Sequence, residues 1–203
     1  MRFRTLGQRV LIVTMAHTMW WSVFTGCAGQ TTAARGDERG LQTQSPQGEA
    51  IVHGSRHLEW VPFFPGETDQ CGPVTLAGVL SFWGTHVEPN TLESEVYLKK
   101  VKGSLPIDLL LTAKRHGFQA ETHSGDLAYI KTEIEAGHPL IAFVNLGSTI
   151  FPKGHYVVIT GYDDGKRGIY VNSGPTADRF LSYDEFTQGW EKTGRWTLKI
   201  LPR

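Results

Sequence analysis

Cys71, His155 and Asn172 are the residues whose types and order could support nucleophilic catalysis. Cys71 stands directly before Gly72 and Pro73, at the start of a predicted apolar helix, where backbone N–H groups favour the reactive thiolate. His155 opens a β-branched strand, and Asn172 ends the next one, across a predicted Asp-Gly hairpin turn. Because a hairpin pairs its strands antiparallel, we expect the His155 end of one strand to meet the Asn172 end of the other, as a Cys–His–Asn site requires.

Each of these residues also has an ordinary structural interpretation. Cys71 could be a small buried residue in the first turn of a helix, or could form a disulfide with Cys27. His155 could be a strand-edge residue, and Asn172 a turn residue before Ser-Gly-Pro. The other histidines lie in the N-terminal segment or beside turns and glycines, and no carboxylate or cysteine completes a metal site near them. No metal site is therefore predicted.

Residues 1–26 are typical of a secretory signal that ends in a lipidation site. Arg2, Arg4 and Arg9 give a positive start, an apolar stretch follows over 10–24, and small residues precede Cys27. The ending Phe-Thr-Gly-Cys resembles a bacterial lipobox, in which the cysteine is lipidated and becomes the first residue of the mature protein. A plain signal peptide and an uncleaved anchor are the alternatives. The stretch is short for a spanning helix, which needs about 20 apolar residues.

The composition predicts one globular domain behind a tether. Residues 27–50 contain almost no large apolar side chain, so we expect a flexible tether there and a folded domain over 51–203. Six Trp, six Tyr and ten Phe supply enough apolar surface for a core. Basic and acidic residues are equal at 20 each, which gives no electrostatic basis for binding nucleic acid.

Local patterns predict an α+β domain in which an N-terminal helical part packs on a mostly antiparallel sheet. Helix signals, including Pro in a first turn and Gly at a stop, are found over 73–83, 91–101, 106–116, 127–136 and 183–192. Strand signals are found over 139–146, 156–162, 168–171 and 195–201. The 73–83 segment is apolar on most faces, which predicts a buried helix.

Three segments carry a resemblance to a known family. The runs TDQCGPVTLAGVL, GHYVVITGYDDG and YVNSGP resemble the papain-like cysteine peptidases related to the bacteriocin-processing (double-glycine leader) peptidases. The closing GRWTLKILP resembles the free-standing lipoprotein branch. The resemblance covers about residues 60–201 and implies a papain-like fold, with Cys71 as nucleophile, His155 as base and Asn172 as the orienting residue. It implies no metal and no organic cofactor.

The sequence departs from that family at two positions. The family usually carries a Gln several residues before the Cys, whose amide helps to form the oxyanion hole, and residues 63–67 contain none. Gln70 is the remaining candidate for this donor. The third catalytic position is often Asp in these peptidases, where Asn172 stands here. Loss of one oxyanion donor lowers the rate by on the order of 10²–10³, so we expect slow or absent turnover unless Gln70 supplies this donor.

The predicted function is a thiol-dependent peptidase that hydrolyses a peptide or amide bond in a peptide or protein substrate. The lipid anchor at Cys27 predicts a place in the bacterial cell envelope, at the outer membrane facing the periplasm. The alternatives are a catalytically silent peptide-binding module on the same fold, an NlpC-type cell-wall peptidase and a phytochelatin-synthase-like transpeptidase. Four aromatic residues are candidates for a pocket wall or for the core: Trp60, Phe63, Trp83 and Phe151.

Overall fold

The computed structural model describes residues 54–66 and 68–203, and all structural statements below concern this part of the chain. The predicted signal peptide 1–26, the lipidation site Cys27 and the tether 27–50 lie outside the described residues. A compact unit spans Glu49–Arg203. None of the helices described is both long enough and apolar enough to cross a membrane.

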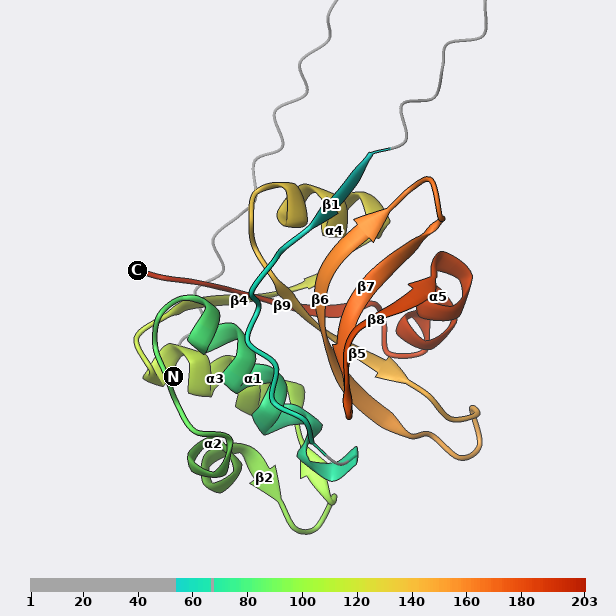
Figure 1. The fold of residues 1–203 in the computed structure, drawn as a ribbon. Helices are drawn as coiled ribbons and strands as arrows, with labels where there is room; N and C mark the ends of the chain where they lie inside the picture. Colours follow the sequence, from blue (N-terminus) through green and yellow to red (C-terminus); the bar gives the residue numbers. More distant parts are fainter. Residues whose placement is uncertain (1–53, 67) are drawn as a thin grey trace, which may run out of the picture. The chain divides into compact units, whose positions relative to one another are not determined.

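An antiparallel sheet forms the centre of the domain (Figure 1). Its main path runs in the order β4-β9-β5-β6-β7-β8, where β4 is Gln119–Ser124, β9 Trp196–Leu201, β5 Leu140–Asn145, β6 Gly154–Asp163, β7 Gly168–Ser173 and β8 Thr176–Ser182. A short strand, β1 (Ser55–His57), pairs with the end of β6. The longest strand, β6, therefore has β5 and then β1 along one edge and β7 along the other.

Helices cover both faces of this sheet. On one face lie α1 (Cys71–Phe82), α2 (Pro89–Val96) and α3 (Pro106–Arg115), and on the other lie α4 (Leu127–Glu135) and α5 (Tyr183–Glu191). A 3-10 turn, η1 (Thr68–Gln70), leads into α1. A two-stranded hairpin made by β2 (Tyr97–Leu98) and β3 (Gly103–Ser104) connects α2 to α3.

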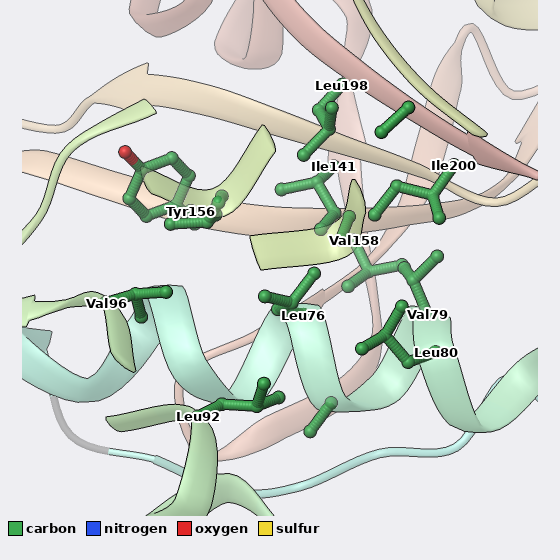
Figure 2. Packing of buried hydrophobic residues seen from close by; sticks show 14 of the residues in the cluster. Leu76, Val79, Leu80, Leu92, Val96, Ile141, Tyr156, Val158, Leu198 and Ile200 are labelled. Atoms are coloured by element: carbon green, nitrogen blue, oxygen red, sulfur yellow. The ribbon is translucent and has the colours of Figure 1, made fainter. Parts of the chain in front are cut away.

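Burial on both faces explains why the central strands are almost continuously apolar. In β6, Tyr156 and Val158 belong to the core beneath α1, whereas Val157 and Ile159 belong to the core beneath α4 and α5. Successive side chains of a strand point to opposite faces, so one run of apolar residues supplies both cores. Figure 2 shows the first of these cores, where side chains of α1 meet those of the sheet.

The predicted buried helix is confirmed as α1. Nearly all of its side chains from Cys71 to Leu80 are buried, because sheet, α2 and α3 surround it. Pro73 lies in its first turn, where the missing N–H breaks no intrahelical bond. At its C-terminal end, the Trp83 indole N–H donates to the Ile200 carbonyl at 2.8 Å and connects the helix to β9. The helix begins two residues earlier than predicted, so Cys71 is its first residue.

The predicted α+β class is confirmed, but one predicted helix is too long and two strands of the main sheet were missed. The helix predicted over 91–101 ends at Val96, and the chain turns into the β2–β3 hairpin with Lys102 at a φ of 51°. Strands β4 and β8 were not predicted. Both are polar edge strands with mostly exposed side chains, so they lack the apolar alternation that marks a half-buried strand.

We predict that Leu76→Ala destabilises the domain strongly. Leu76 is fully buried between α1 and the sheet, so its truncation loses apolar contacts and leaves a cavity, at a cost of about 2–5 kcal/mol. Urea unfolding of the full-length chain measures this loss. The matched control is Leu111→Ala in α3, where the side chain is 46% exposed and the expected change is within about 0.5 kcal/mol. Equal losses in the two variants would contradict the packing described here.

Candidate active site

Cys71 lies at the N-terminus of α1, where its thiol is a free, buried group with 6% of the residue exposed. Burial raises the pKa of the thiol above its ordinary value, and the nearby Asp69 carboxylate acts in the same direction. Hydrogen bonds from the backbone N–H groups of Tyr156, Gly72 and Cys71 lower the pKa but do not outweigh burial. From the sequence, the helix N-terminus was expected to favour the thiolate. Desolvation is larger, so the resting thiol is protonated.

His155 is the second residue of β6 and is 5% exposed. The loop before it is held by Asn145 at the end of β5, whose Oδ1 accepts hydrogen bonds from the N–H groups of Gly147 at 2.9 Å and Lys153 at 2.8 Å. The ring Nε2 forms a hydrogen bond with Ser173 Oγ, and the two atoms lie 3.0 Å apart. The other ring nitrogen, Nδ1, is buried and has no hydrogen-bond partner. One side of the imidazole is therefore fixed, and the other is free to exchange a proton.

The His155 imidazole is neutral at neutral pH. Its burial, together with the smaller effect of the positive charges of Lys153 and Arg179, lowers the pKa to about 4. A neutral imidazole is the form that can accept a proton from a thiol. No hydrogen bond joins either ring nitrogen to Cys71, because Nε2 is bonded to Ser173 and Nδ1 is unpartnered. Catalytic hydrogen bonds are often absent or long without substrate and form when it binds.

Cys71 and His155 line the same cleft, which has a volume of about 850 Å³. Its other walls come from the β2–β3 hairpin and the residue after it, from β5, from the loop that leads into β6, and from the turn between β7 and β8. They include Val101, Lys102, Leu105, Phe143, Pro152, Lys153, Gly174 and Pro175. None of the four aromatic residues considered as a pocket wall lines it. Phe143 and the hairpin were missed, because only the fold brings them beside Cys71.

Two glycines of the family-like motifs allow the cleft walls to approach each other closely. A Cβ atom on Gly72 would lie 2.5 Å from Ser104 Oγ, so only glycine permits β3 to pack beside Cys71. A Cβ atom on Gly154 would lie 2.6 Å from the Phe143 ring, next to His155. These contacts give the Cys-Gly-Pro and Gly-His-Tyr runs a structural reason that is independent of any resemblance.

Asn172 lies in β7, which pairs antiparallel with β6 as the hairpin predicted. Its partner in the register is Val158 rather than His155, and the pairing contains an irregularity between Ile159 and Gly161. The Asn172 Oδ1 accepts a hydrogen bond from the Asp178 N–H at 2.9 Å. The ring of His155 instead contacts Ser173, the next residue, which the sequence reasoning missed. The orienting role of Asn172 stays a prediction.

The Gln70 side chain, the predicted oxyanion donor, donates from Nε2 to Glu93 Oε2 at 3.5 Å. Gln70 is not among the residues that line the cleft. Its role in an oxyanion hole also stays a prediction. In the described part of the chain, no cluster of three or more His, Cys, Asp or Glu side chains has the arrangement of a metal site.

Comparison with solved structures shows the fold. The peptidase domain of Streptococcus ComA, a bi-functional ABC transporter, matches with a TM-score of 0.60 and 22% identity, over 70% of this chain and 99% of that one. A double glycine motif protease from an AMS/PCAT transporter, solved with its leader peptide, matches with a TM-score of 0.59 and 22% identity, over 73% and 95%. A candidate C39-like peptidase from Bacillus anthracis matches with a TM-score of 0.59 and 19% identity, over 74% and 98%. The predicted peptidase fold is therefore confirmed.

A search of curated proteins finds no match. The model of the Peptidase_C39 like family matches residues 56–197, which is most of the folded domain and most of the chain. This stretch contains both Cys71 and His155, and it agrees with the family that the three motifs indicated rather than with the NlpC type. The chain belongs to the Peptidase_C39 like family and is, at the level of that family, a cysteine peptidase.

Proposed function

We propose that the protein hydrolyses a peptide or amide bond by acyl transfer, with Cys71 as nucleophile and His155 as general base. The observation that carries the proposal is their meeting in one cleft, where the thiol lies at a helix N-terminus and the imidazole keeps a buried, unpartnered Nδ1. A nucleophile beside a base that a third group orients is the general pattern of this chemistry.

The two groups begin the reaction uncharged. Nδ1 of His155 takes the proton of the Cys71 thiol as the sulfur attacks the carbonyl carbon of the substrate, so no resting thiolate–imidazolium pair is needed. The imidazolium then gives this proton to the leaving nitrogen as the C–N bond breaks. Water attacks the resulting thioester, transfers a proton to the imidazole and releases the acid, and the thiol recovers its proton.

The oxyanion is stabilised by backbone N–H groups at the start of α1. The N–H groups of Cys71, Gly72 and Tyr156 already hydrogen-bond the thiol, so they surround the atom that attacks. In the related peptidases part of this role belongs to a Gln side chain, and Gln70 adjoins Cys71 in the sequence. A Gln70 contribution requires its amide to leave Glu93, to which it donates in this structure.

A peptide is the substrate class that the cleft and the comparisons favour. The related double glycine motif protease was solved with a leader peptide, and it shares this fold. The cleft is bounded by hairpin backbone on one side and by the loop into β6 on the other, which suits an extended chain. The domain would act on a peptide or protein at the cell envelope, where the predicted lipid on Cys27 would hold it.

We predict that Cys71→Ser abolishes hydrolysis and that His155→Gln lowers it by on the order of 10²–10⁴, because the base is lost while the nucleophile remains. Mass spectrometry of a peptide library incubated with the full-length chain measures new termini. His86→Gln is the matched control, since this exposed residue lies outside the cleft. Binding of library peptides without cleavage, unchanged by Cys71→Ser, would instead identify a silent binding module.

We predict that His155 makes the fold acid-sensitive between about pH 6.5 and pH 4. Its pKa is about 4 in the folded protein and 6.5 when unfolded, so the unfolded chain binds the extra proton in this window. The stability is present above pH 6.5 and falls as the pH is lowered, by about 3 kcal/mol in total at about 1.4 kcal/mol per unit.

Urea unfolding of the full-length chain across this pH range measures the effect. The difference between wild type and His155→Gln should shrink by about 3 kcal/mol as the pH falls from 6.5 to 4. His86→Gln controls for the general loss of stability in acid. Parallel curves for wild type and His155→Gln would show that the buried imidazole is not the group responsible.

We predict that Cys27→Ser moves the protein from the membrane fraction to the soluble fraction of a bacterial cell. The reason is that the variant lacks the thiol to which the lipid would be attached. Fractionation followed by immunoblotting measures the distribution, with Cys71→Ser as the control that removes the other cysteine. Retention of Cys27→Ser in the membrane at wild-type levels would argue for an uncleaved anchor.

A further inference from the structure

We propose that Ser173, and not Asn172, is the positioning residue that orients the His155 imidazole. The inference rests on the proposed Cys71–His155 function and adds to it the identity of the third group. Its basis is the contact between His155 Nε2 and Ser173 Oγ at 3.0 Å, while the predicted partner, Asn172, makes no hydrogen bond to the ring.

The carboxamide of Asn172 already has a structural task. Its Oδ1 accepts from the Asp178 N–H at 2.9 Å, and Asp178 has a φ of 48°, a conformation that needs such support. The Asp178 carboxylate in turn accepts from Thr160 Oγ1 at 3.3 Å and lies 3.0 Å from His57 Nε2. Asn172 therefore holds the start of β8 against β7 and β6, in a network that does not include His155.

Asn172 and Ser173 occupy different positions in the register and bond different groups. Asn172 is opposite Val158 in the register and lines a small cavity with Val74 and Tyr156, on the α1 side of the sheet. The β7–β8 pairing is irregular between Val171 and Ser173, and it is the Ser173 hydroxyl, at the border of the same cavity, that meets the ring of His155.

A hydroxyl orients the ring without supplying charge. When Nε2–H donates to Ser173 Oγ, the lone pair of Nδ1 is left free to take the thiol proton, in agreement with the unpartnered Nδ1. A carboxylate at this place would also stabilise the imidazolium, but a hydroxyl does so only weakly. The charged groups that act on the ring, Lys153 before β6 and Arg179 in β8, both oppose protonation. Ser173 thus fits a site whose base stays neutral until it receives the thiol proton.

The first test is the titration of the His155 ring, followed by NMR in the full-length chain, with the His155 signal assigned through its loss in His155→Gln. Ser173→Asp should raise the pKa of His155 from about 4 by roughly two units, because it places a carboxylate beside Nε2. Asn172→Ala should leave the ring titration unchanged while lowering stability through the loss of the Asp178 contact. The proposal would be overturned if the pKa of His155 changed in Asn172→Ala and kept its wild-type value in Ser173→Asp.

The second test is the rate at which iodoacetamide alkylates Cys71 near neutral pH, mapped by mass spectrometry. Ser173→Ala should slow alkylation about tenfold by releasing the ring, and Ser173→Thr should restore it because the hydroxyl is kept. Equal rates in Ser173→Ala and wild type, with His155→Gln slow, would overturn the proposal while leaving the Cys–His pair intact. If the rate of Cys71 alkylation did not change in His155→Gln, the proposed function would be contradicted. The ring titration would still decide which residue is the partner of His155.

Discussion

Burial of β6 on both faces is the constraint on which the rest of the structure depends. Val158 and Tyr156 meet α1, and Val157 and Ile159 meet α4 and α5, so the strand cannot shift by one residue without exposing one core and overfilling the other. Tyr156 extends this constraint to the cleft. Its hydroxyl donates to the Ser104 carbonyl at 3.0 Å, and its N–H hydrogen-bonds the Cys71 thiol. A core residue therefore places the hairpin wall, the nucleophile and the neighbouring His155 relative to one another.

The same burial determines the protonation states of the site. Desolvation raises the pKa of the Cys71 thiol and lowers that of the His155 imidazole, so both shifts oppose a resting ion pair. Hydrogen bonds at the helix N-terminus act against only one of these shifts. Proton transfer then has to accompany attack on the substrate, which makes the approach and orientation of the ring more important than its basicity. A neutral thiol is also a weak nucleophile in the absence of substrate.

Much of the fold could be predicted from the sequence, because most of its elements have strong local signals. The apolar run of α1, and the Pro and Gly at the ends of α3, specify those elements without knowledge of their neighbours. Local signals do not predict the elements that form only by pairing with distant segments. Strand β4 has only Ala120 buried and forms because β9 offers it an edge. Residues 97–101 leave their predicted helix and join a hairpin that packs beside the start of α1. Both depend on contacts between distant segments, which local propensity does not contain.

The candidate site shows the same division at the scale of single residues. Residue type and strand order were enough to bring Cys71 and His155 to one cleft. The third residue depends on register, and β7 pairs irregularly with β6 between Ile159 and Gly161 and with β8 between Val171 and Ser173. In β7, Asn172 and Ser173 are adjacent in the sequence, and each carries a hydrogen-bonding side chain that meets a different group. A preference for Asn as a catalytic partner selects the first. The positions of the ring and of the Asp178 N–H select the second, because the carboxamide oxygen of Asn172 accepts from the β8 backbone while the Ser173 hydroxyl bonds the ring.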